Sequence, residues 1–488
     1  MRISTLKELV LYRYRYALGI ILLIAFGVIL TTWQLGSIPP GFTKDEMASA
    51  VAANNLTHLS TSFVNAPYLL LQKASLDLFG PSSLGIRLPS VVLAMLLAFA
   101  AFGLLRKWFS HNVTVIGTIL IITASHFLLR GRTGSPAIMY SFWTLALLAS
   151  AALANHQVTG QKFWFWLFCL CAGLSLYTPF FCFIVLFIIV AILLSRQARG
   201  IFEEVGQATI AVSIFTFVAV VAPLGYSFYM HPSGILDLVG FTDFSTLAET
   251  KTRALYLLQT MVSFTPADSR ILVPSLSLPA VALALYGLYV AIRHLGAIRN
   301  AIVVLLLALA VVLYISTPSA PYALVFVPST LLVILGLHAF INKWYVLFPR
   351  NPYARIIALF PLAFLLVVMV QFNYTRYFYG LARSEAVRAN YNDDILLIEK
   401  KLAKQPLLQS SVIVVNKDQQ SFYKLLQHDY PNLSIVTPET VASKAGSAIF
   451  IVASSEQAAA ATVLPNVAPQ FLADERPGDA LRFRIYRN

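Results

Sequence analysis

Long apolar stretches, separated by short polar ones, dominate the chain. About eleven of them are long enough to cross a bilayer, because a spanning helix needs roughly 17–25 mostly apolar residues. The predicted spans cover residues 17–35, 87–105, 113–129, 136–154, 163–178, 180–195, 208–228, 274–292, 301–316, 322–341 and 355–372. Two longer polar segments, 36–86 and 229–273, interrupt this series. The pattern therefore predicts an all-α polytopic membrane domain over residues 1–384, with two large loops.

The segment 385–488 has a different pattern. "SSVIVVNK" and "SAIFIVAS" are short apolar runs typical of buried strands, and "ALRFRIYR" alternates like a closing strand. "DQQSFYKLLQHD" has the spacing of an amphipathic helix. These patterns predict a small α/β domain after the last span.

Composition and charge place the chain in a membrane. It is 58% hydrophobic and 11% charged, whereas about 25% of the residues of a soluble domain are charged. The net charge of +14 does not indicate nucleic-acid binding, since the cations lie mainly at the ends of apolar runs. The positive-inside rule then predicts a multi-pass protein of the cell membrane with a cytoplasmic N-terminus. Segments 36–86, 229–273 and 385–488 fall on the opposite, outer side.

Acidic residues mark the outer surface as the place for chemistry. Seven of the acids before residue 385 fall in the two outer loops: Asp45, Glu46, Asp77, Asp237, Asp243, Glu249 and Asp268. None lies well inside a predicted span, where a proton-coupled transporter usually keeps one. The distribution predicts a site built from loops at the outer face of a helical scaffold.

The pair Asp45 and Glu46 follows the first span within "GFTKDEMASA". Thr43 and Glu46 have the spacing of a capping box, in which the two residues bond each other's backbone amides at the start of a helix. This role accounts for Glu46 better than catalysis does. It leaves the carboxylate of Asp45 free for chemistry.

The order of several segments resembles a known family. "IPPGFTKDEMASAVAANNL" follows the first span, and "APYLLLQKASLDLFGPSSLGIRLPS" leads into the second. With "GLSLYTPFFCFIVLF" and "SFTPADSRILVPSLSLPAVALALYGLYVAIR" further along, the chain is similar to GT-C membrane glycosyltransferases over most of residues 17–340. The branch is that of the protein O-mannosyltransferases and the lipid A aminoarabinose transferases.

This resemblance implies a reaction and assigns roles. Such enzymes take a sugar from a polyprenyl-phosphate carrier and place it on an acceptor at the outer face of the membrane. The resemblance places Asp45 in the active site, acting on the acceptor nucleophile, with Asp268 lining the same region. We expect Glu46 to act chiefly as a helix cap, with a supporting role in catalysis. The chain departs from many relatives at Asn65-Ala66-Pro67, where they carry His-Pro-Pro.

The leaving phosphate needs cations, and arginine matches phosphate oxygens in a bidentate manner. The outer-face candidates are Arg130, Arg132, Lys251, Arg253 and Arg270. The alternative for Lys251 and Arg253 is that they reach toward lipid headgroups. Oxygen ligands for Mg²⁺ or Mn²⁺ could come from Asp45, Glu46 and Asp268, although nothing in the sequence requires a metal.

Three classes of function compete on the sequence. A transporter or flippase of lipid-linked sugars predicts polar residues at mid-membrane and an internal repeat, and neither is evident. A non-catalytic scaffold gives no reason for acids and arginines to gather in the outer loops. We therefore expect a glycosyltransferase with a polyprenyl-phosphate sugar donor and a protein, lipid or glycan acceptor. The sequence does not identify the sugar.

Overall fold

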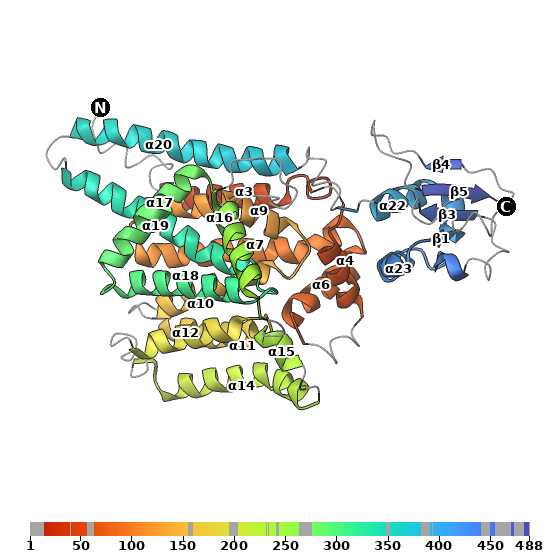
Figure 1. The fold of residues 1–488 in the computed structure, drawn as a ribbon, viewed down its shortest axis with the longest axis horizontal. Helices are drawn as coiled ribbons and strands as arrows, with labels where there is room; N and C mark the ends of the chain where they lie inside the picture. Colours follow the sequence, from red (N-terminus) through yellow and green to blue (C-terminus); the bar gives the residue numbers. More distant parts are fainter. Residues whose placement is uncertain are drawn as a thin grey trace.

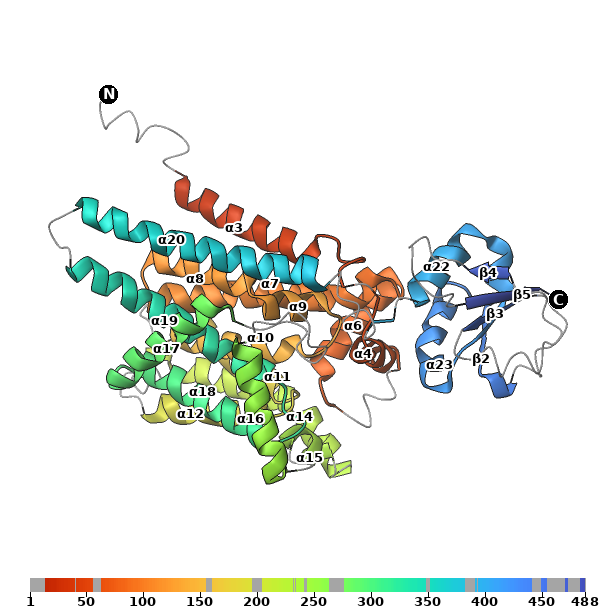
Figure 2. The same ribbon diagram turned by 45° about the horizontal axis from the view of Figure 1, so that its top comes forward.

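A bundle of long helices carries a smaller α/β domain at one end (Figures 1 and 2). The computed structural model describes residues 14–39, 41–55, 63–154, 160–194, 204–230, 232, 234–240, 244–262, 276–347, 352–381, 391–392, 394–440, 449–453, 470–472 and 483–487. Within these ranges every predicted span coincides with a helix.

The helices of the bundle follow the apolar runs closely, because run length is a local property of the sequence. They are α3 (Arg15–Thr32), α7 (Ser83–Trp108), α8 (His111–Thr123), α9 (Ser125–Arg132), α10 (Ile138–Ala154), α11 (Gln161–Ser175), α12 (Phe181–Leu194), α14 (Gln207–Met230), α17 (Leu278–Arg293), α18 (Ile298–Ser316), α19 (Ala323–Leu347) and α20 (Pro352–Thr375). The third predicted span, 113–129, is divided between α8 and α9, which are bent by 57° at Ala124. A short π-helix, η1 (Arg376–Leu381), extends α20.

Length and composition support a multi-pass membrane protein. Five helices of the described residues are long and apolar enough to span a membrane, and six if the α8–α9 pair forms one broken span. Several others are apolar but shorter, α10, α12 and α17 among them. Burial separates inner from outer helices: 78% of the apolar window of α19 is buried, against 11% of that of α14. The surface of α14 is therefore the kind that faces lipid.

The two predicted loops contain helices of their own. Segment 36–86 holds α4 (Lys44–Asn54) and α6 (Ala66–Phe79), and segment 229–273 holds α15 (Gly234–Val239) and α16 (Leu247–Val262). In both views α4 and α6 lie at the end of the bundle next to the α/β domain (Figures 1 and 2). We call this the α4 end.

The α/β domain contains a mixed sheet. Its elements are α22 (Asp394–Lys404), η2 (Pro406–Ser410), β1 (Val412–Val414), α23 (Lys417–Tyr423), η3 (Lys424–His428), β2 (Ser434–Val436), β3 (Ile449–Ala453), β4 (Gln470–Leu472) and β5 (Phe483–Arg487). The strand order is β2-β1-β3-β5-β4, with β1 parallel to both its neighbours and β5 antiparallel to β3 and β4. The segments predicted as strands correspond to β1, β3 and β5. The predicted amphipathic helix corresponds to α23 and η3.

One residue of the α3–α4 connection joins the domain to the bundle. Phe42 exchanges two backbone hydrogen bonds with Asn392, at 2.7 and 2.8 Å, and forms an isolated antiparallel bridge. Its ring meets that of Phe422 on α23 edge to face, with centroids 5.8 Å apart. The α/β domain is thus packed directly against the segment that leads into α4.

Candidate functional site

The start of α4 has the local structure that its sequence predicts. Thr43 is the N-cap: its hydroxyl accepts a hydrogen bond from the Glu46 amide at 3.2 Å, and the Glu46 carboxylate accepts one from the Thr43 amide at 2.8 Å. The capping box is therefore confirmed. It fixes the first turn of α4, which also carries Asp45.

Glu46 does more than cap the helix. Its side chain is fully buried, and its Oε1 accepts hydrogen bonds from Arg87 Nε at 3.0 Å and from the Gly134 amide at 2.8 Å. Gly134 lies so close to α7 that an added Cβ would come within 2.5 Å of the Ile86 carbonyl oxygen. Glu46 thus joins α4, α7 and the loop after α9. It has no exposure to substrate, so the structure does not support its predicted catalytic role.

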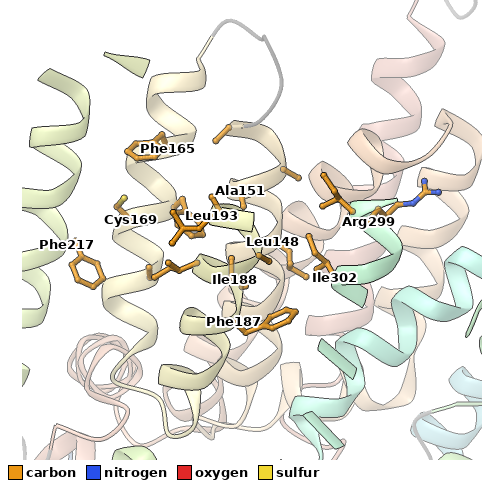
Figure 3. A pocket seen from close by; sticks show the side chains of 18 of the residues that line it. Leu148, Ala151, Phe165, Cys169, Phe187, Ile188, Leu193, Phe217, Arg299 and Ile302 are labelled. Atoms are coloured by element: carbon orange, nitrogen blue, oxygen red, sulfur yellow. The ribbon is translucent and has the colours of Figure 1, made fainter. Parts of the chain in front are cut away.

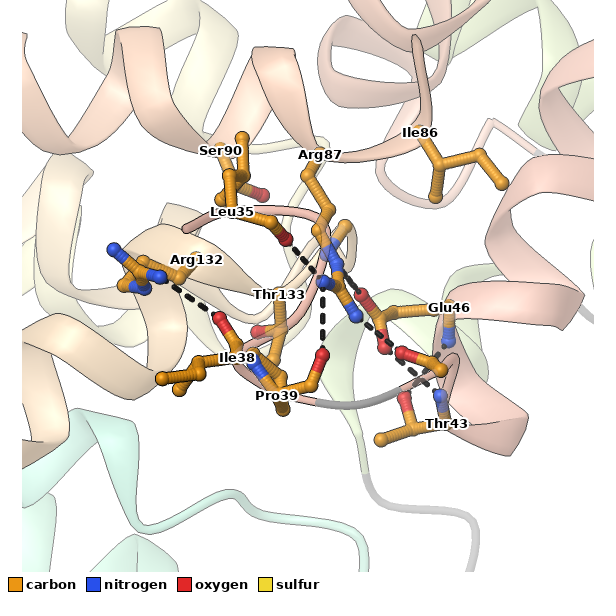
Figure 4. A network of polar contacts seen from close by, with 12 residues as sticks. Leu35, Ile38, Pro39, Thr43, Glu46, Ile86, Arg87, Ser90, Arg132 and Thr133 are labelled. Atoms are coloured by element: carbon orange, nitrogen blue, oxygen red, sulfur yellow. Dashed lines mark hydrogen bonds and ion pairs between the residues drawn. The ribbon is translucent and has the colours of Figure 1, made fainter. Parts of the chain in front are cut away.

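Two buried arginines hold the connection between α3 and α4 (Figure 4). Arg87 and Arg132 are both completely buried. The Arg87 guanidinium donates to carbonyl oxygens of this connection: Leu35 at 2.6 Å, Pro39 at 3.2 Å, and Gly41. Arg132 donates to Leu30 at 2.7 Å, Trp33 at 2.6 Å and Ile38 at 2.8 Å. Backbone carbonyls that no strand or helix satisfies are therefore bonded by side chains.

This arrangement corrects the prediction for Arg132. Its Nε donates to the Tyr377 hydroxyl at 3.1 Å, and its guanidinium lies over the rings of Tyr377 and Phe378. Arg130 and Arg132 both belong to the last turn of α9. A buried guanidinium with its donors engaged has no access to a carrier phosphate. Arg132 stabilises the scaffold.

Arg130 has the opposite environment. It is only partly buried, and its Nε is a buried donor without a hydrogen-bond partner. The exposed carboxylate of Asp45 exerts the strongest attraction of any charged group on its guanidinium. The two do not form one of the direct ion pairs found in the described part of the chain. An acid and a cation thus lie near each other without forming a direct ion pair.

Phenols from three separate elements lie near Arg130. They are Tyr140 on α10, Tyr256 on α16 and Tyr391, just before the α/β domain. Tyr391 is 8% exposed, and burial raises the pKa of its phenol, so the hydroxyl keeps its proton and can donate to an anion. Tyr256 brings α16 near Arg130, and a single site built by both loops stays a prediction.

The remaining residues predicted to bind the phosphate are Arg253, Lys251 and Arg270. Arg253 on α16 donates to three carbonyl oxygens, of Tyr314, Pro318 and Ala320, at 2.8, 2.8 and 2.9 Å. It therefore ties α16 to the α18–α19 connection. Lys251 lies exposed on α16. Asp268 and Arg270 lie outside the described residues, and their roles stay predictions.

Metal binding also stays a prediction. The described residues hold no group of three or more His, Cys, Asp or Glu side chains that could bind a metal ion. Glu46 is unavailable as a ligand, because its two carboxylate oxygens are occupied by Thr43, Arg87 and Gly134. Of the three predicted ligands, Asp45 and Asp268 are left to supply oxygens to Mg²⁺ or Mn²⁺.

The segment Asn65-Ala66-Pro67, where many members of the resembled family carry His-Pro-Pro, lies at the start of α6. Asn65 has a left-handed backbone with φ of 57°, which asparagine tolerates better than most residues. Its amide donates to the Tyr177 carbonyl at 2.7 Å, while its side-chain Oδ1 is buried without a partner. The segment joins α6 to the α11–α12 connection.

Two residues of this region were not predicted. Arg87 was not among the outer-face cations, although a basic residue at the end of a span predicted to face outward departs from the positive-inside rule and could have drawn attention. Gln72 was also missed. Buried on α6, it accepts from Ser49 at 2.6 Å and donates to the carbonyls of Ile86 and Gly134, each at 3.1 Å. No sequence pattern identifies such a residue.

Comparisons with known proteins show what this architecture resembles. Residues 66–226 match the family model described as dolichyl-phosphate-mannose-protein mannosyltransferase. The crystal structure of ArnT from Cupriavidus metallidurans in the apo state is 13% identical, with a TM-score of 0.59, and the match covers 97% of this chain and 98% of that one. ArnT bound to undecaprenyl phosphate gives 13% identity, a TM-score of 0.57, and coverage of 96% and 97%.

An oligosaccharyltransferase has the same arrangement. The apo form of the Archaeoglobus fulgidus enzyme is 13% identical, with a TM-score of 0.52, and the match covers 98% of this chain and 75% of that chain. No curated protein sequence matches the chain. At these identities the structures establish the fold, and the predicted GT-C fold is confirmed. The family model adds that the likeness to the O-mannosyltransferase branch extends to sequence over residues 66–226.

Proposed function

We propose that the chain is a membrane glycosyltransferase that moves a sugar from a polyprenyl-phosphate-linked donor to an acceptor at the α4 end. The observation that carries the proposal is the exposed carboxylate of Asp45 near the partly buried Arg130, whose Nε has no hydrogen-bond partner. The match to a mannosyltransferase family model and the likeness to a structure bound to undecaprenyl phosphate support it. Neither comparison favours a transporter or flippase.

The chemistry follows from the two charges. Asp45 would take the proton from the acceptor group as that group attacks the anomeric carbon, which needs a base within ~3 Å of the nucleophile. The bond from this carbon to the phosphate oxygen breaks, and its electron pair goes to the phosphate. Arg130 would stabilise the charge that grows there, with Tyr391 as a neutral donor. A single displacement of this kind inverts the sugar carbon.

The test replaces Asp45 by Asn, which keeps its size and removes the base. We expect turnover to fall about 10²–10⁴-fold, the usual contribution of a general base. Asp77→Asn is the matched control, because it removes a partly exposed acid from the same loop that pairs with Lys73. The measurements are sugar transfer by purified protein from a short-chain polyprenyl-phosphate donor, and mass spectrometry of polyprenyl-phosphate sugars in cells. Equal turnover by Asp45→Asn and the parent would refute the proposed base.

The proposal includes the orientation of the chain, with the N-terminus in the cytoplasm and the α4 end outside. Ser410→Cys places a thiol at an exposed position of the α/β domain. Gly296→Cys places one at an exposed position between α17 and α18, where an added Cβ meets no other atom. An impermeant thiol reagent should label the first variant in intact cells, and the second only after the membrane is opened. The reverse pattern would invert the topology.

A further inference from the structure

A cavity of about 420 Å³ lies at the other end of the bundle, among α10, α11, α12, α14 and α18 (Figure 3). Trp108, the last residue of α7, also lines it. Arg87 and Trp108 are 21 residues apart on α7, or about 30 Å along its axis, so the cavity is remote from the Asp45 site. Its volume falls in the range of pockets that hold small molecules.

The walls of the cavity are almost entirely hydrocarbon. Figure 3 shows Phe165, Cys169 and Phe217 on one side, with Ile302 and Arg299 at the other. Water needs two to four polar partners to occupy a buried space, and these walls do not provide them. A hydrocarbon chain, by contrast, gives up no hydrogen bonds on entering from a bilayer, and the walls offer it packing contacts.

The cavity opens on the surface of the bundle that faces lipid. Ile189 and Leu193 on α12 and Ile214 on α14 line it and are 39%, 54% and 56% exposed. Because α14 is a candidate span whose apolar window is only 11% buried, this surface is of the kind that faces lipid. A lipid chain can therefore enter sideways between α12 and α14.

A cation lies at the edge of the cavity. The stem of Arg299 lines it, while Nη1 donates to the Trp108 carbonyl at 2.6 Å and the guanidinium lies over the Phe109 ring. Within the described ranges no acid pairs with Arg299. Arg106 and Lys107 add positive charge to the same end of α7. A lipid in the cavity would place its headgroup beside uncompensated positive charge, which favours an anionic phosphate.

We propose that this cavity binds one acyl chain of an anionic glycerophospholipid whose phosphate interacts with Arg299. We assign a bilayer lipid and not the sugar donor, because on the proposed function the donor's phosphate binds about 30 Å from Arg299, at the opposite end of α7. The site is therefore separate from the transfer reaction, and its test needs no activity measurement.

The test counts lipids retained by the purified full chain in native mass spectrometry, after release from nanodiscs of phosphatidylglycerol or phosphatidylcholine. We expect one phosphatidylglycerol per chain to persist and phosphatidylcholine to be lost. Ala151→Phe projects a ring from the cavity wall and should abolish retention. Arg299→Gln should reduce it about fivefold, the effect of one basic residue near an anionic membrane surface. Gly225→Phe, on α14 where an added Cβ meets no other atom, is the control and should retain the lipid.

Three results would overturn the proposal. They are retention of no lipid by the parent chain, retention of a polyprenyl phosphate in place of a glycerophospholipid, and equal retention by the parent and Ala151→Phe. Thermal unfolding of each variant confirms that it is folded. Cys169 gives a second measurement: in a chain lacking the other two cysteines, its alkylation should be slower in phosphatidylglycerol than in phosphatidylcholine. Equal alkylation rates would contradict the proposed preference for an anionic lipid.

Discussion

Arg130 and Arg132 lie two residues apart on α9, yet they belong to different regions of the molecule. Arg132 belongs to a buried layer with Glu46 and Arg87, in which its donors bond carbonyl oxygens and a phenol. Arg130 belongs with Asp45 to a partly exposed layer, in which its Nε has no partner. Of two side chains of the same type, Arg132 thus stabilises the fold and Arg130 is available to a ligand.

The difference shows that partners, more than residue type, decide the role of a charge. Asp45 and Glu46 on α4 show the same difference: Glu46 is fully buried and hydrogen-bonded, whereas Asp45 is exposed. The buried layer fixes the segment from which Asp45 projects, so it positions the acid without touching a substrate. Variants that separate stability from activity can therefore test the assignment of each layer.

The largest effect on stability is expected from Arg87→Met. This change leaves the carboxylate of Glu46 buried without its cation, and breaking a buried pair costs about 3–5 kcal/mol. Lys73→Met is the matched control, because it breaks the more exposed pair with Asp77 and should cost about 0–1 kcal/mol. Unfolding of both variants in detergent measures the difference. Equal stabilities would mean that the buried layer does not hold the α3–α4 connection.

A smaller loss is expected from Glu46→Gln. Glutamine has nearly the same shape and can keep the bond to the Thr43 amide, but it leaves the Arg87 charge uncompensated. We therefore expect a loss at the lower end of the range for a broken buried pair, which is about 3–5 kcal/mol. Asp45→Asn, one residue earlier, should change stability by less than about 0.5 kcal/mol, because its side chain is exposed. Glu46→Gln should thus lose stability, whereas Asp45→Asn should lose turnover. A stable but inactive Glu46→Gln would move catalysis to Glu46.

The smallest expected effect is the difference in stability between variants of two capping boxes. Thr246 and Glu249 form a second box at the start of α16, with an amide-to-carboxylate distance of 2.8 Å, but in an exposed setting. Loss of an N-cap costs about 0.5–2 kcal/mol, so Thr43→Ala should fall near the top of this range and Thr246→Ala near the bottom. Unfolding measurements check the order. The reverse order would mean that the Thr43 capping box does not contribute to the stability of the buried layer.

Much of the fold was predictable from sequence, because hydropathy and capping are local. The apolar runs gave the positions of the helices, and Thr43-x-x-Glu46 gave the start of α4. The bend between α8 and α9 was not predicted, since no proline or glycine marks it at Ala124–Ser125.

The site was only partly predictable. Both arginines of "RGRTGSP" have the same neighbours in sequence, so nothing local separates Arg130 from Arg132. What separates them is distant: Arg132 bonds carbonyls about a hundred positions earlier in the chain, and Glu46 bonds Arg87, 41 positions later. Such pairings depend on how the helices pack, which periodicity does not specify.

The most direct test of the two layers is the affinity of the purified chain for a short-chain polyprenyl monophosphate, measured for the parent and for Arg130→Gln. Hydrogen bonds to charged groups contribute about 1.5–3 kcal/mol, so the account predicts that Arg130→Gln weakens binding by roughly 10–150-fold. It also predicts an unchanged unfolding temperature, because the scaffold remains intact. Arg293→Gln, which removes an exposed arginine at the end of α17, should bind like the parent. Unchanged affinity of Arg130→Gln, or a loss of stability like that of Arg87→Met, would contradict the account.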